Sequence, residues 1–259
     1  MPATSTATHK GVTITFTEAD HKYETPDFDD FVSSSGIIHQ FFPEFDSEAI
    51  SERIAAKRGK TPLQLRNEWK ANADAACDYG TRCHEVAEYI FTDRLSELHT
   101  PRNPKEQNTF AVAWNAVQML KEQYQSIGCE LIVFSERLRV CGTLDLLMYD
   151  PATNTVLILD WKTNREIKQS AFKGEKGFAP IQHLENCNYH HYSLQLSIYE
   201  FLMRHEGYYP PDTKYRRALI HLTETEPIWY ELPCRQFEVS QMLLYHKTSH
   251  WELEKGLPF

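Results

Sequence analysis

The chain has 259 residues, of which 41% are hydrophobic and 24% are charged, and its formal net charge is −9. This length suits one large domain with an ample core, and the composition excludes the collagen-like and disordered classes. The acidic balance argues against a surface that is basic all over for non-specific binding of nucleic acid, but it still allows a local basic groove.

The first half of the chain is mostly helical by pattern. A polar stretch with two prolines, residues 100–107, predicts a loop, and Gly80 predicts a break between two helices. Before these lie an alternating, β-branched segment and a region rich in Asp, Ser, Tyr and Pro. The expected elements are a strand at 11–16, a turn region at 20–35 and helices at 45–58, 61–77, 82–91 and 110–126.

The pattern changes to strands after residue 129. Residues 150–154 favour a tight turn between two of them, and residues 174–188 have the composition of a mobile loop. The expected elements are strands at 130–136, 139–148, 155–162, 218–222 and 228–232, and helices at 189–204 and 240–254. The sum is an α/β domain in which helices flank a small sheet, preceded by a helical N-terminal third.

No segment is long and apolar enough to span a bilayer, and residues 1–10 lack the apolar core of an export signal. We therefore expect a cytoplasmic protein without membrane contact. The six cysteines form no CxxC pair, and their scatter indicates reduced, structural thiols rather than a zinc site or an iron–sulfur cluster.

Two aspartates and a lysine stand out in the strand region. Asp160 and Lys162 alternate with Trp161, so their side chains point to the same face of a strand, and a hairpin can bring Asp145 beside Asp160. Two carboxylates are hard ligands suited to Mg²⁺ or Mn²⁺, and a lysine can stabilise the charge of a phosphoryl transition state. A buried salt bridge between Lys162 and one aspartate is the alternative interpretation.

Further residues extend this constellation. His84 is a candidate metal ligand that shares a helix face with Glu88, although it could also be a surface or capping residue. Glu136 could add another carboxylate, or it could be an ordinary charge at a strand edge. Gln195 and Tyr199 lie four residues apart on one helix face, where they could equally serve packing.

Together these residues resemble the RecB-type branch of the PD-(D/E)XK nuclease superfamily. That branch has a GTxxH helix, a GxxD strand, a D-x-K strand and a QxxxY helix, and this order holds here from Gly80 to Tyr199. An ordered match of four motifs is far more specific than D-x-K alone. The region before Gly80 is similar to phage relatives of this branch.

The resemblance implies a restriction-endonuclease-like α/β core with a central mixed sheet. We expect an N-terminal strand and helical region at 1–79, packed on a nuclease core at 80–259. The implied metal ligands are His84, Asp145, Asp160 and the carbonyl of Trp161, with Lys162 as the catalytic lysine. Glu136 would lie near the metal or the scissile phosphate, and Glu88 would support a ligand. The residues implied to contact DNA or brace the site are Gln195, Tyr199, Thr163 and Arg82.

The resemblance also implies the activity. It favours a Mg²⁺- or Mn²⁺-dependent DNA exonuclease that acts on free ends or single strands in recombination, repair or replication, in a bacterial or phage-infected cytoplasm, with a recombination or replication protein as a partner. A structure-specific or nicking endonuclease is the second interpretation, and a silent nucleic-acid or protein-binding module is the third. Members with an iron–sulfur cluster carry three late cysteines, whereas only Cys234 follows Tyr199 here, so we expect no cluster.

Overall fold

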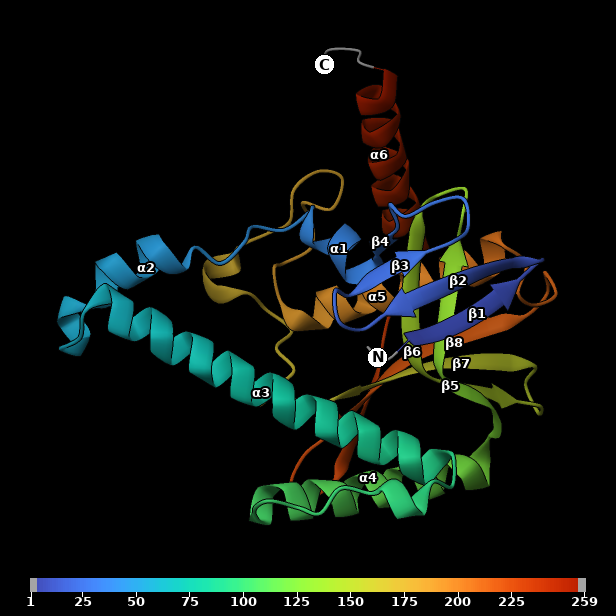
Figure 1. Cartoon of the computed structure of the whole chain (residues 1–259), viewed down its shortest axis with the longest axis horizontal. Helices are drawn as coiled ribbons and strands as arrows, with labels where there is room; N and C mark the ends of the chain where they lie inside the picture. Colours follow the sequence, from blue (N-terminus) through green and yellow to red (C-terminus); the bar gives the residue numbers. More distant parts are fainter. Residues whose placement is uncertain (1–3, 256–259) are drawn as a thin grey trace.

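Strands rich in β-branched and large apolar residues form the centre of the molecule in the computed structural model, which describes residues 4–255 and, for side chains, residues up to 247 (Figure 1). Six strands build one mixed sheet in the order β4–β6–β7–β8–β9, and β5 pairs with β6 as well. The strands are β4 (Val32–Ser33), β5 (Gln125–Ser135), β6 (Val140–Asp150), β7 (Thr155–Lys162), β8 (Lys214–Leu222) and β9 (Pro227–Glu231). The expected fold class, a mixed sheet flanked by helices, is confirmed.

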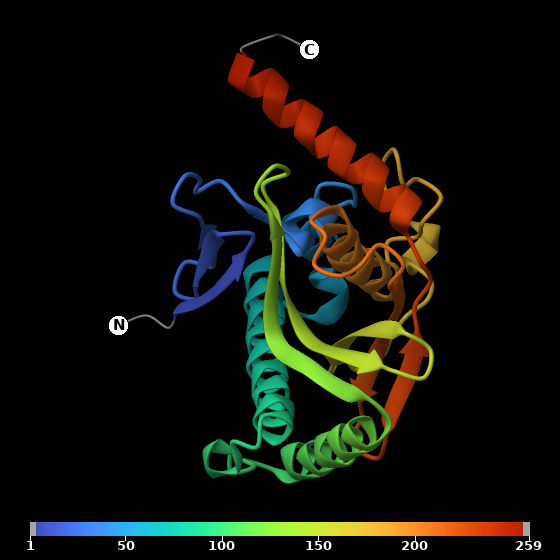
Figure 2. The same cartoon turned by 90° about the vertical axis from the view of Figure 1, so that its right-hand side faces the viewer.

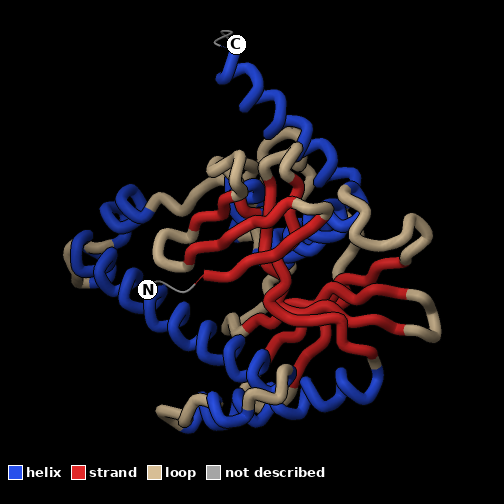
Figure 3. The backbone as a smooth tube through the Cα atoms, turned by 45° about the vertical axis from the view of Figure 1, so that its right-hand side comes forward, coloured by secondary structure: helices blue, strands red, loops and turns tan. Residues whose placement is uncertain are grey.

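Helices cover both faces of this sheet, and Figure 3 shows the strands between them. One buried apolar cluster joins the sheet to α1 (Ser34–His39), α5 (Asn188–His205) and the start of α6 (Gln236–Lys255). A second cluster joins the opposite face to α4 (Pro104–Gln123) and to the second half of α3 (Pro62–Phe91). None of the described helices has the length and apolarity that a membrane crossing needs.

The N-terminal region begins with a small sheet rather than a single strand. Three antiparallel strands, β1 (Thr4–His9), β2 (Val12–Thr17) and β3 (Lys22–Glu24), pack through Ile14 and Tyr23 against β5 and β6. The expected turn region at 20–35 therefore contains β3, β4 and the start of α1. Four short helices complete the described part of the chain: α2 (Ser47–Ile54), η1 (Ala56–Arg58), η2 (Leu95–Glu97) and η3 (Phe172–Gly174).

Helix α3 is one continuous helix of 30 residues. Its start is as predicted, because Thr61 caps it and Gln64 completes a capping box. The predicted break at Gly80 is wrong: the helix runs through it, and a side chain there would approach Thr163 Oγ1 at 3.2 Å. Gly80 thus serves close packing of α3 on the end of β7, and the expected boundary between residues 79 and 80 falls inside this helix.

Strand β6 divides the sheet. Figure 2 shows β5 and β6 as a long, bent pair. Along its other edge, β6 pairs with β4 only at Val140 and Cys141, and with β7 only from Leu146 onward. Residues 142–145 thus have no strand partner on that edge among the described residues, and this gap between β4 and β7 opens the sheet at Asp145.

Candidate active site

Asp145 and Asp160 lie at the fork where β6 and β7 separate. The antiparallel pairing of these strands ends at Leu146 and Leu159, so the two aspartates are the first residues beyond it. Asp145 Oδ2 accepts a hydrogen bond of 2.9 Å from the backbone N–H of Trp161. This bond fixes the Asp145 carboxylate across the fork, while the indole of Trp161 is buried in the core below α3 and α4.

Helix α3 brings His84 to the same point. His84 Nδ1 lies 3.2 Å from Asp145 Oδ2, and the imidazole also forms a hydrogen bond with the Trp161 backbone. Burial lowers the pKa of His84, and the nearby Asp145 carboxylate opposes this shift without reversing it. The imidazole is therefore neutral near pH 7, which is the form that binds a metal ion.

Asp160 and Lys162 point to the face of the sheet that α5 covers, and they form an ion pair. The Asp160 side chain is only 3% exposed and that of Lys162 15% exposed. Burial alone would lower the pKa of Lys162, but Asp160 and Asp145 outweigh it and the pKa is raised. The ammonium thus stays charged across the working pH range, as a lysine that stabilises negative charge must.

Two neighbouring carboxylates make this a site of high negative charge density. Burial raises the pKa of Asp160 to about 7, the charge of Asp145 acts in the same direction, and Lys162 opposes both. A divalent cation would relieve this repulsion. The donor set of one imidazole, two carboxylates and a backbone carbonyl suits Mn²⁺ or Mg²⁺. Within the described residues, however, no three such side chains already form a closed metal-binding group.

The affinity for Mn²⁺ should rise with pH. Asp160 must lose its proton before it binds the ion, and its pKa is raised to about 7. Below that pH the affinity should increase about tenfold per unit, and above it the curve should flatten. His84 adds no step near pH 7, because its pKa is lowered. Calorimetric titration between pH 5.5 and 8.5 measures this, and a pH-independent affinity for the wild-type protein would contradict it. Lys214→Ala, at the exposed start of β8, is the control and should keep the wild-type pH dependence.

Gln195 and Tyr199 of α5 brace the site from one side. Tyr199 is 2% exposed, and its hydroxyl accepts hydrogen bonds from Gln195 Nε2 (2.9 Å) and Ser34 Oγ (3.2 Å). Its ring packs on Gly142 of β6, where an added Cβ would lie 2.3 Å from Tyr199 Cε1. The geometry thus supports bracing for Tyr199, because its hydroxyl is buried away from any substrate.

Two expected residues lie away from the site. Glu136 sits just beyond β5, at the tip of the β5–β6 hairpin, and accepts a hydrogen bond from Thr25 Oγ1. Five strand residues, roughly 16 Å, separate that tip from Asp145. Arg82 points from α3 toward α4, where it binds Glu106 and the carbonyl of Thr100. The geometry therefore corrects the expectation that Glu136 lies near the metal ligands. It places Arg82 in contact with Glu106 and Thr100, and a DNA contact of Arg82 stays a prediction.

Glu130, which was not expected, faces the site instead of Glu136. Its neighbours on β5 pair as Cys129–Leu146 and Leu131–Leu144, so Glu130 lies opposite Asp145. Its φ is +50°, an unusual conformation for a residue with a side chain. Loss of solvation at Glu130, with Asp145, Glu88 and Asp160 nearby, raises its pKa to about 8.

Glu88 and Thr163 lie near the site and contact residues around it. Glu88, one turn after His84 on α3, forms an ion pair with Arg94 and adds negative charge beside Glu130. Thr163 lies against Gly80, so it couples the end of β7 to α3. Among the described residues, no hydrogen bond or ion pair joins either of them to Asp145 or Asp160.

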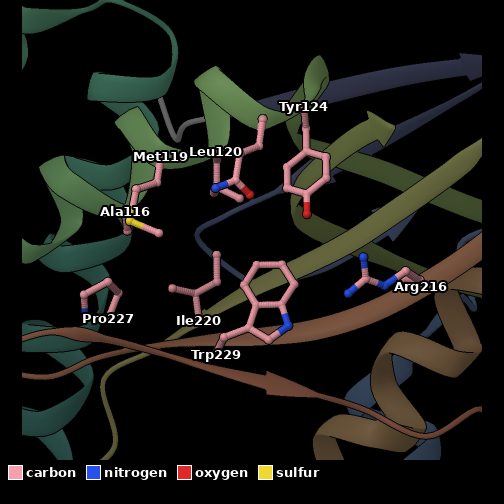
Figure 4. Close-up of a pocket in the computed structure, with 9 residues that line it drawn as sticks. Ala116, Met119, Leu120, Tyr124, Arg216, Ile220, Pro227 and Trp229 are labelled. Atoms are coloured by element: carbon pink, nitrogen blue, oxygen red, sulfur yellow. The ribbon is translucent and has the colours of Figure 1, made fainter. Parts of the chain in front are cut away.

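A separate pocket of about 290 Å³ lies on the other face of the sheet, between α4 and the strands β8 and β9 (Figure 4). Met119 and Leu120 of α4 face Ile220 and Trp229 across it. None of the catalytic candidates lines this pocket.

Comparison with known protein families finds a match over the part of the chain that contains β6, β7 and α5. The sequence model of the PD-(D/E)XK nuclease superfamily matches residues 105–248, which is more than half of the chain. The matched segment includes Asp145, Asp160, Lys162, Gln195 and Tyr199, whereas His84 lies outside it. No curated protein matches the chain.

Proposed function

Because the chain belongs to the PD-(D/E)XK nuclease superfamily, we propose that it is a divalent-metal-dependent deoxyribonuclease of the RecB-type branch that digests DNA from a free end. The convergence of His84, Asp145, Asp160 and Lys162 at one fork of the sheet carries this proposal. The placement of His84 beside Asp145 and the bond between Gln195 and Tyr199 support the assignment to the branch. End-directed digestion of this kind serves DNA recombination, repair or replication.

The residues have distinct tasks in this mechanism. His84, Asp145 and Asp160 would hold the cation, with the Trp161 carbonyl as a further ligand. The bound cation supplies phosphate charge neutralisation and a lowered pKa for a bound water. Lys162 donates hydrogen bonds to the oxygens of the phosphate as negative charge develops on them. Asp145 is held by the Trp161 N–H and so keeps its orientation before substrate arrives.

The segment that follows Lys162 is suited to an unpaired strand. Residues 163–187 run from the site to the start of α5 and include η3 (Phe172–Gly174). Phe172 is 82% exposed and Phe178 53% exposed. Lys173 and Lys176 are exposed between them, and neither forms an ion pair within the described part of the chain. Exposed aromatic rings beside lysines that form no ion pair bind single-stranded nucleic acid through base stacking and phosphate contacts.

Removing one ring and one charge from this segment should weaken strand binding. Phe172→Ala with Lys173→Ser is expected to lower the affinity for a single-stranded oligonucleotide about tenfold, because base stacking and a phosphate contact are lost together. Fluorescence anisotropy with Ca²⁺ in place of Mg²⁺ measures binding. Phe237→Ala, at a ring that is 73% exposed on α6, is the matched control. Equal losses in both proteins would rule out a specific strand path.

Cleavage of linear and circular DNA tests the proposed activity. We expect linear single-stranded DNA to be digested with Mg²⁺ or Mn²⁺, and circular single-stranded DNA of the same sequence to resist. Cleavage of both at equal rates would make the protein an endonuclease. Absence of cleavage of any DNA, by protein that binds Mn²⁺ and oligonucleotide, would instead indicate a binding module. Duplex DNA and RNA substrates in the same series show which type of nucleic acid the protein prefers.

A further inference from the structure

Lys162 has a second contact besides its ion pair with Asp160. Its Nζ lies 4.6 Å from the centre of the Tyr192 ring, which α5 presents one turn before Gln195. A lysine ammonium over an aromatic face is attracted by the ring's quadrupole. The ammonium is therefore held between a carboxylate on β7 and a ring on α5.

Tyr192 is itself fixed to the end of β7. Its hydroxyl donates a 2.7 Å hydrogen bond to Asn164 Oδ1, and Asn164 lies two residues after Lys162. The carbonyl of Asn164 accepts a 2.6 Å bond from His221 Nε2. Since a carbonyl can only accept, this nitrogen carries the proton. His221 is 6% exposed and is the partner of Lys162 in the pairing of β7 with β8.

These contacts surround the Lys162 side chain. The bond between Asn164 and His221 fixes the backbone just after Lys162, and the Tyr192 ring contacts the Lys162 ammonium. We propose that Tyr192 is a positioning residue for Lys162, with Asn164 and His221 fixing the ring in place. This inference rests on the proposed nuclease function, in which Lys162 is the catalytic lysine.

The need for such a residue follows from the double role of Asp160. Its carboxylate is both the ion-pair partner of Lys162 and a proposed ligand of the cation, so its charge is shared between them. The Tyr192 ring gives the Lys162 ammonium a second contact, which does not depend on how the charge of Asp160 is shared. It fixes the direction of the remaining N–H donors, and rate depends steeply on such alignment.

Three variants of α5 test the proposal. Tyr192→Leu should lower kcat for DNA cleavage about tenfold with little change in KM, because the aromatic support is lost. Tyr192→Phe keeps the ring and should remain within about threefold of the wild-type kcat. Tyr189→Leu removes an equally half-buried tyrosine one turn earlier on α5 and should leave kcat unchanged. Thermal melts of all three proteins report any general loss of stability.

A second measurement needs no nuclease activity. Reductive methylation followed by mass spectrometry reports how accessible the Lys162 amine is, and we expect faster labelling in Tyr192→Leu than in the wild-type protein, Tyr192→Phe or Tyr189→Leu. Equal labelling and equal kcat in Tyr192→Leu and the wild type would overturn the positioning role. If the wild-type protein cleaves no substrate, the labelling result still decides whether Tyr192 holds Lys162, and only the proposed function fails.

Discussion

Replacing Lys162 with alanine should lower the rate of metal-dependent DNA cleavage about a thousandfold, because a charged donor aimed at the reacting phosphate is lost from a water-poor site. Its ammonium stays protonated beside Asp160 and Asp145, so the full charge is removed by the substitution. Single-turnover cleavage of a labelled linear oligonucleotide, with enzyme in excess, measures the chemical step without product release.

Metal binding separates this effect from a collapse of the site. Lys162→Ala should still bind Mn²⁺, since the three proposed ligands remain, whereas Asp160→Asn should lose both binding and cleavage. Lys214→Ala, at an exposed lysine that begins β8, is the matched control and should cleave at the wild-type rate. If Lys162→Ala cleaves DNA as fast as this control, Lys162 has no role in catalysis.

Strands with a simple, continuous pattern were predictable from the sequence. The bounds of β7 agree with the prediction to the residue, because an unbroken apolar run ending in charged residues has few other conformations in an α/β core. The break predicted at Gly80 is wrong because glycine is common just past helix ends and unfavourable inside a helix, and both tendencies suggested a boundary. The tertiary contact with Thr163 decides the matter there, and no local pattern contains that contact.

The candidate site residues that belong to sequence motifs could be proposed from the sequence. Glu130 could not, because its place opposite Asp145 depends on the pairing register of β5 with β6. The pairing of Ser135 with Val140 sets the register that places Glu130 opposite Asp145. Counting back from the hairpin turn finds Glu130, whereas Glu136, which was expected near the metal, lies at the turn itself. Tyr192 and His221 act through contacts among α5, β7 and β8, which lie far apart in sequence.

The salt bridge between Lys162 and Asp160, first weighed as an alternative to catalysis, is present in the folded chain. The two interpretations are compatible, because the pair keeps a buried lysine charged until substrate and cation arrive. What separates this pair from an ordinary structural salt bridge is the third and fourth groups, Asp145 and His84, at the same fork.

Gly142→Ala should destabilise the protein by about 2 kcal/mol or more, because overpacking a core contact forces side chains or backbone to move. The added Cβ would lie 2.3 Å from Tyr199 Cε1 and 3.1 Å from Ser34 Oγ. Tyr199 is buried and hydrogen-bonded, so the ring cannot simply rotate away. Displacing it would shift α5, which also carries Gln195 and Tyr192. Urea unfolding monitored by tryptophan fluorescence measures the change in the free energy of unfolding.

Gly80→Ala is the matched control, since it adds the same methyl group at the other motif glycine. There the nearest atom is the hydroxyl of Thr163 at 3.2 Å, and alanine favours a helix interior over glycine by up to about 1 kcal/mol, so the stability should stay near that of the wild type or rise. A double-mutant cycle with Tyr199→Ala then isolates the clash. If Gly142→Ala costs as much without the Tyr199 ring as with it, the glycine is required for some reason other than this contact.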